Sequence, residues 1–162
     1  MNKKVRELLN AQVNKEFYSA YLYIGISKYY TKINLPGFAA WYRVQAREEQ
    51  EHAMKIYDYL LDNDEDVSLD QIGRVEVEIN SPIDAAKEAD KHEHYITGEI
   101  VKIMDAAVEA KDYRTQLFLN WFISEQAEEE RNSKDMVDRI ELVGNDNKSL
   151  YLLDREVGSR KD

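Results

Sequence analysis

A helical repeat interrupted once is the feature that most constrains the fold. Apolar residues recur at steps of three and four along nearly the whole chain. The repeat predicts four long helices and a short fifth, at about 3–32, 35–62, 82–110, 112–143 and 147–157. The stretch from 63 to 80 lacks this repeat, and its Val-Glu-Val-Glu-Ile segment is too short and isolated to form a sheet. We therefore expect an extended connector there.

Capping residues support these boundaries. Ser81 followed by proline predicts a helix start, because a side-chain oxygen caps the first free amides and proline suits the first helical position. Asn34 and Asp112 are expected to cap the helices that follow them, and Gly144 is expected to end the fourth helix. The connections between the long helices then run short, long, short.

This order of connections predicts the topology. Short loops place neighbouring helices antiparallel, whereas a connector of about 18 residues can run the length of a bundle. We expect an all-α protein, with two antiparallel helix pairs joined by one crossover and a short C-terminal helix. The 162 residues suffice for one domain, 1–162.

Composition excludes several classes of function. A formal net charge of -10 argues against nucleic acid as a partner and favours cations. No apolar run approaches the roughly 20 residues of a membrane helix, and the first residues lack the apolar core of a signal peptide, so we expect a cytoplasmic protein without a membrane partner. The absence of cysteine excludes disulfides, thiolate metal sites, iron–sulfur clusters and a cysteine nucleophile.

The apolar stripe of each long helix becomes acidic near its middle. The acids that break the four stripes are Glu16, Glu49, Glu93 and Glu129. No lysine or arginine shares these stripes, and burying uncompensated carboxylates costs several kcal/mol each. Two divalent cations would match their four negative charges. We therefore predict a metal centre inside the bundle.

His52 adds a nitrogen ligand to this acidic layer. It follows Glu49 by three residues, so both side chains leave the same side of one helical turn. The Glu-x-x-His pair is common by chance in acidic helices, but three partner acids on other helices make it specific. Oxygens with one imidazole suit iron or manganese, and zinc could also bind.

Four segments resemble bacterial non-haem ferritins of the ferritin family, over essentially the whole chain. They are NKEFYSAYLY (14–23), REEQEHAMKIYDYL (47–60), KHEHYIT (91–97) and NWFISEQAEEE (120–130). The resemblance implies a ferritin-like bundle in a hollow shell of 24 identical subunits. Such a shell would oxidise Fe(II) with O2 or H2O2 and store a ferric mineral.

The resemblance also implies roles for the acidic layer. Glu16, Glu49 and His52 would hold one iron of a di-iron ferroxidase centre. Glu49 would bridge to a second iron, which Glu93 and Glu129 also bind.

Three further residues resemble neighbours of that centre in the family. Gln126 resembles a glutamine beside the second iron, Tyr23 a tyrosine that donates electrons, and Trp121 its aromatic neighbour. For both aromatic residues, core packing is the alternative.

A third iron site facing the cavity is implied at Glu48, Glu125 and Glu128. The alternative is a solvated acidic helix face, which the run Ala-Glu-Glu-Glu (127–130) favours.

Departures from related families narrow the resemblance. Bacterioferritin-like proteins carry a second Glu-x-x-His on a later helix, where this chain has Glu125-x-x-Glu128. They also place a haem-binding methionine where this chain has Gln50, so we expect no haem. Rubrerythrins need cysteine, and the DNA-protecting mini-ferritins lack a fifth helix.

The last helix and the remaining histidines give weaker expectations. Leu150, Tyr151, Leu152 and Leu153 are too apolar for a free tail, so we expect a subunit contact, with packing on the same bundle as the alternative. His92 is expected in an exposed pair with Glu88, and neither His92 nor His94 is assigned to metal.

Iron storage with ferroxidase activity is thus the favoured function. Two alternatives remain on the same bundle: a small-molecule oxidase or peroxidase with a dimetal site, and a non-catalytic helical interaction module with a polar core layer.

Overall fold

The computed structural model describes residues 1–159 and contains five helices in that range. They are α1 (Lys3–Lys32), α2 (Pro36–Asp62), α3 (Pro82–Glu109), α4 (Tyr113–Val143) and α5 (Asn147–Val157). The predicted all-α architecture is confirmed, with each boundary within one residue or two of its expected position. None of the helices described is long and apolar enough to cross a membrane.

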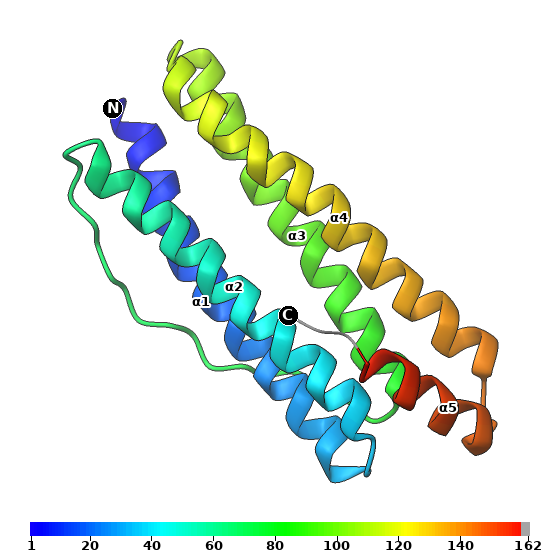
Figure 1. Cartoon of the computed structure of the whole chain (residues 1–162). Helices are drawn as coiled ribbons and strands as arrows, with labels where there is room; N and C mark the ends of the chain where they lie inside the picture. Colours follow the sequence, from blue (N-terminus) through cyan, green and yellow to red (C-terminus); the bar gives the residue numbers. More distant parts are fainter. Residues whose placement is uncertain (160–162) are drawn as a thin grey trace.

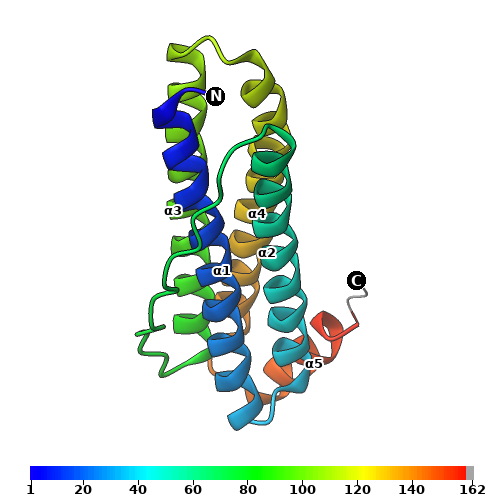
Figure 2. The ribbon, with the colours of Figure 1, turned by 90° about the vertical axis from the view of Figure 1, so that its left-hand side faces the viewer.

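The four long helices form two antiparallel pairs. Helix α1 packs against α2 and α3 against α4, while α1 and α3 join the pairs. Residues 63–80 form no helix or strand and run along the outside of the α1/α2 pair from one end of the bundle to the other (Figure 1). Seen from the side, this connector passes over α1 (Figure 2). The crossover therefore sets α3 antiparallel to α1, as the connection lengths predict.

Three of the four residues predicted to cap or end a helix do so: Ser81, Asp112 and Gly144. The Ser81 hydroxyl accepts from the Asp84 amide at 3.2 Å, and the Asp112 carboxylate accepts from the Thr115 amide at 3.0 Å. Gly144 ends α4 with φ 59°, in the region that favours glycine.

The predicted cap at Asn34 is wrong. Asn34 takes a left-handed conformation, φ 60°, in the turn between α1 and α2, so its side chain does not cap α2. Leu35 occupies the N-cap position and supplies no side-chain hydrogen bond. Instead, the carboxylate of Asp154 on α5 accepts from the Phe38 amide at 2.8 Å. Asp154 of α5 thus accepts a hydrogen bond from a free amide in the first turn of α2.

Helix α5 lies across the end of the bundle and contacts α2 and α4 (Figure 1). The approach to α2 is close: a Cβ added at Gly37 would lie 1.7 Å from the backbone oxygen of Asp154. Leu153 and Val157 are buried, whereas Tyr151 and Leu152 remain more than half exposed. One face of α5 therefore packs on its own bundle, and the other is left open.

The core is divided into two apolar clusters. One cluster surrounds Tyr30 and Phe38 at the α5 end of the bundle, and the other surrounds Leu9 and Ile100 at the opposite end. The acidic residues of the helix stripes lie between these clusters. The fold thereby encloses a polar layer with apolar packing on both sides.

Candidate metal centre

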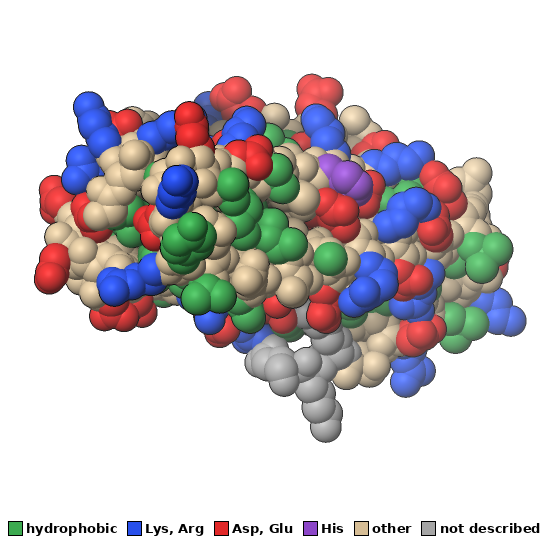
Figure 3. Space-filling model, turned by 90° about the horizontal axis from the view of Figure 1, so that it is seen from above, with side chains coloured by type: hydrophobic (Ala, Val, Ile, Leu, Met, Phe, Trp, Pro, Cys, Tyr) green, Lys and Arg blue, Asp and Glu red, His purple; other side chains and the backbone are tan. Residues whose placement is uncertain are grey.

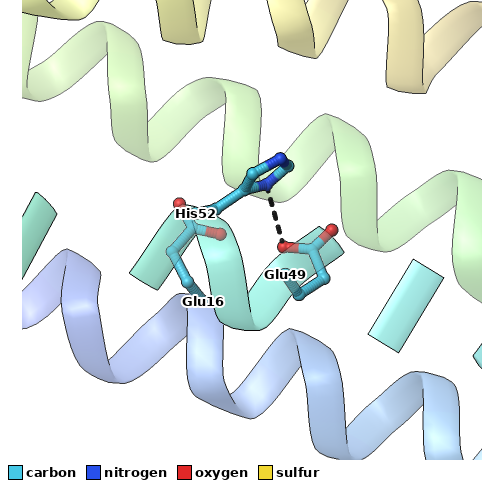
Figure 4. A group of neighbouring side chains, drawn as sticks. All are labelled: Glu16, Glu49 and His52. Carbon is cyan, nitrogen blue, oxygen red and sulfur yellow. Dashed lines mark ion pairs between the residues drawn. The ribbon is translucent and has the colours of Figure 1, made fainter. Parts of the chain in front are cut away.

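Glu16, Glu49 and His52 converge from the facing sides of α1 and α2. Each residue offers one ligand atom, and these atoms all lie within 4.8 Å of one another. Figure 4 shows the three side chains directed toward a common point. Glu49 and His52 reach it together because three residues of helix return a side chain to the same side. Within residues 1–159, this is the single group of three acidic or histidine residues with such spacing.

Glu93 and Glu129 enter the same layer from α3 and α4. The Tyr23 hydroxyl donates to Oε1 of Glu93, and the Gln126 amide donates to Oε2 of Glu93 at 3.1 Å. The Gln45 amide of α2 donates to Oε2 of Glu129 at 2.8 Å. The structure thus brings all four stripe acids into one layer, with Tyr23 and Gln126 both touching Glu93.

All four carboxyl groups are nearly inaccessible to solvent. The exposed fraction is 1% for Glu16, 2% for Glu49, 1% for Glu93 and 4% for Glu129. No lysine or arginine is buried among the residues that the structure describes. The protein therefore supplies acids to this layer without supplying a cation to balance them.

Burial is the largest cause of the raised pKa of each carboxyl. It lifts the pKa of Glu16 and of Glu49 well above 4.5, and neighbouring carboxylates raise both further. The pKa of Glu93 is also raised, although two hydrogen bonds oppose the effect. Burial and then Glu93 raise the pKa of Glu129 to about 7. A bound cation would favour the ionised forms and reverse these shifts.

Unpaired atoms show that the layer fits a metal. Oε2 of Glu16 and Nδ1 of His52 are buried and make no hydrogen bond. Nδ1 lies 3.5 Å from Oε2 of Glu49. Buried polar atoms normally have a partner, so unpaired atoms on two of the three converging residues, Glu16 and His52, indicate that a ligand belongs between them. Hard oxygens with one imidazole suit divalent iron, manganese or zinc.

An open groove of about 640 Å³ borders this layer between α2 and α4. Glu48 and Glu125 line it, and Oε1 of Glu125 lies 3.9 Å from Nε2 of His52. Glu128 does not line the groove: its side chain is 59% exposed and lies 4.0 Å from Arg131. Of the three residues expected at a third iron site, the structure brings two to the groove and leaves the third on the solvated face.

Trp121 lies at the rim of the layer, 38% exposed, and its ring packs edge-on against the buried Phe122 with centroids 4.8 Å apart. Its ring meets the His52 ring edge-on with centroids 5.4 Å apart. The Lys55 ammonium lies 4.3 Å from the centroid of its ring, a cation–π contact. Trp121 thereby covers His52 on the side toward the groove.

The expected exposed pair of His92 with Glu88 is also wrong. His92 is only 8% exposed, and its Nε2 lies 2.7 Å from the Ser19 hydroxyl of α1. Burial lowers the pKa of His92 to about 4, so the ring is neutral. His94 is the exposed one, with Nδ1 at 2.9 Å from the backbone oxygen of Asp90. The two rings lie on different sides of α3, as a separation of two residues requires.

Two glutamine side chains contact the acids but are not predicted from the sequence as site residues. Gln12 and Gln45 are buried in the stripes of α1 and α2, and each donates to one carboxylate of the layer. The available signal was their position on the buried stripe, one helical turn before Glu16 and Glu49.

The chain is similar to known proteins over nearly its whole length. Residues 6–143 match the model of the ferritin-like domain of the Ferritin family. A bacterial non-heme ferritin of Staphylococcus epidermidis is 36% identical over 160 residues, covering 99% of this chain and 96% of the relative. One of Campylobacter jejuni is 37% identical over 157 residues, covering 97% and 94%.

Solved structures give the same result. An open-pore ferritin of the hyperthermophilic archaeon Archaeoglobus fulgidus superposes with a TM-score of 0.97 at 38% identity, covering 99% of both chains. Sequence and fold therefore agree over nearly the full length, and the chain belongs to the ferritin family.

Proposed function

We propose that this protein stores iron and oxidises Fe(II) at a di-iron centre formed by its four long helices. Membership of the ferritin family supports iron storage in general. The observation that carries the specific proposal is the convergence of Glu16, Glu49 and His52 within 4.8 Å, buried and without a balancing cation.

The proposed centre has two subsites for the substrate iron. Glu16 and His52 belong to the first subsite, Glu93 and Glu129 to the second, and Glu49 bridges them. Fe(II) binding displaces the protons that the raised pKa values favour, so the carboxylates bind in their ionised form. Two ferrous ions give one electron each, and O2 with two protons becomes H2O2; alternatively, H2O2 with two protons becomes two water molecules.

The surrounding residues support this chemistry through position and charge. We propose Tyr23 as the electron donor of the second subsite, and the hydrogen bond from its hydroxyl to Glu93 supports this role. The Gln126 amide orients the same carboxylate. The apolar clusters at both ends keep water away from the layer, which strengthens the attraction between carboxylates and iron.

The groove beside the centre is a candidate route for iron leaving it. Glu48 and Glu125 line the groove, and acidic oxygens attract Fe(III) more strongly than Fe(II) because the charge is higher. Glu128 would join them as a third site only by turning away from Arg131.

We further propose that the whole chain, 1–162, acts as one domain within a cytoplasmic shell of 24 copies, without haem. Exposed apolar residues support assembly: Leu69 is 70% exposed, Leu117 72% and Leu142 88%. Figure 3 shows hydrophobic side chains gathered on one face among mixed charges. Neighbouring apolar side chains on a surface, as in this view, are typical of protein contact surfaces. Native mass spectrometry tests the number of copies.

Rapid-mixing oxidation of Fe(II) by the assembled protein tests the centre. Substituting Glu49→Ala removes the proposed bridge, and we expect the fast phase of ferric absorbance to fall to the rate of buffer alone while the native mass is unchanged. Glu7→Ala removes one exposed acid of α1 and serves as the matched control. Wild-type rates in Glu49→Ala would contradict the proposal.

A further inference from the structure

Gln12 is fully buried one turn before Glu16 on α1. Its amide nitrogen donates to Oε1 of Glu16 at 2.8 Å. Its amide oxygen has no hydrogen-bond partner, although the residue is 0% exposed. The other carboxylate oxygen, Oε2 of Glu16, is also unpaired. One amide therefore holds one oxygen of this acid and leaves the other available.

Gln45 has the corresponding contact on the opposite side of the layer. It is 4% exposed, and its amide nitrogen donates to Oε2 of Glu129 at 2.8 Å. This bond crosses from α2 to α4, whereas the Gln12 bond stays within α1. Two of the three non-bridging acids, Glu16 and Glu129, thus each receive one neutral amide donor, from the same helix for Glu16 and from another helix for Glu129.

The chemistry of the donor matters. A lysine at either position would balance the acid and repel an incoming cation, whereas an amide orients the carboxylate without changing its charge. A hydrogen bond to one oxygen also disfavours binding of a metal through both oxygens. The acid then binds through one atom, and the metal keeps coordination positions open for the bridge and the oxidant.

We propose that Gln12 and Gln45 are positioning residues, each fixing one terminal carboxylate so that it binds its own iron through a single oxygen. This inference rests on the proposed di-iron function. Gln12 acts on the subsite of Glu16 and His52, and Gln45 on the subsite of Glu129. The unpaired oxygen of Gln12 adds an acceptor for a water molecule that enters with the metal.

Zn²⁺ binding to the assembled protein tests the proposal without redox chemistry. Crystals of the wild type, Gln12→Leu and Gln45→Leu are soaked in graded Zn²⁺, and anomalous scattering gives the occupancy of each subsite. Loss of such an outer hydrogen bond weakens metal affinity about 10–100-fold. We expect Gln12→Leu to lower Zn²⁺ affinity by this factor at the Glu16 subsite, and Gln45→Leu to do so at the Glu129 subsite. Each variant should affect the other subsite less.

Control variants separate positioning from stability. Gln50→Leu makes the same change at an exposed site of α2 next to Glu49, and we expect wild-type occupancy. Gln12→Met and Gln45→Met keep the length of the side chain and replace the leucine variants if those do not assemble. Zn²⁺ bound through both oxygens of Glu16 in the Gln12 variant would support the role directly.

The outcomes distinguish the two proposals. If the wild type binds no Zn²⁺ in the layer, the di-iron centre itself is wrong and the inference falls with it. If the wild type fills both subsites and the variants do so equally, only the positioning inference is overturned. Equal weakening of both subsites by either variant would also overturn it, because a purely structural defect has no preference between them.

Discussion

Replacing Glu129 with glutamine should stabilise the metal-free protein at neutral and alkaline pH. Glutamine has nearly the same shape as glutamate, and its side-chain oxygen can still accept from Gln45. The substitution therefore removes the ionisable group and little else. In the metal-free wild type, ionised Glu129 lies buried beside Glu93 without a cation, and this state is unfavourable.

The size of the effect follows from the pKa of Glu129, which rises from 4.5 to about 7 on folding. Between these values the folded state holds a proton that the unfolded state has lost, so the free energy of unfolding falls as pH rises. Below pH 4.5 both states are protonated and the wild type suffers no loss. A shift of about 2.5 units corresponds to about 3 kcal/mol above pH 7. For a chain of this length, that raises Tm by about 6–12 °C.

Differential scanning calorimetry after treatment with a chelator measures this difference. We expect the Tm values of Glu129→Gln and the wild type to agree near pH 4.5 and to separate progressively up to pH 8. Adding Zn²⁺ at pH 8 should reduce the difference in Tm or reverse its sign, because the variant has lost a metal ligand and gains less stability from the metal. A difference in Tm that stays constant across this pH range would refute the assignment of Glu129 as a buried, uncompensated acid.

Three further substitutions probe the structure. Gly37→Ala places a Cβ against the backbone of Asp154 and should release α5 to proteolysis, whereas Gly98→Ala, which meets nothing within 4 Å, should leave α5 protected. Asp154→Ala removes the acceptor of the Phe38 amide and should lower the free energy of unfolding by about 1 kcal/mol in denaturant titrations, while Asp154→Asn retains most of it. Tyr23→Phe removes a hydrogen bond that lowers the pKa of Glu93, so the midpoint of Zn²⁺ binding against pH should move upward; an unchanged midpoint would contradict the coupling.

The helices could be predicted because the signals that bound them are local. Ser81 and Asp112 each cap an amide three residues away, and Gly144 acts at its own position. The start of α2 could not be predicted in this way. Its acceptor is Asp154, and no periodicity in the sequence links residues that far apart.

The acidic layer was visible in the sequence because helical steps of three and four place Glu16 and Glu49 on buried stripes. What the sequence does not show is which neighbour each polar atom meets. The burial of His92 depends on Ser19 of another helix, and the hydrogen bond that Glu129 receives comes from Gln45 of α2. Such choices depend on tertiary packing and not on spacing within one helix.

The contact between Asp154 and Phe38 joins residues 116 positions apart. During synthesis, α2 emerges long before α5, so the first turn of α2 must wait with its amide open to water while three further segments are made. The α1/α2 pair can form early from its own apolar contacts, but its end near Leu35 is completed last. The end of the bundle near Leu35 can therefore be completed only after α5 has been made and has docked against α2.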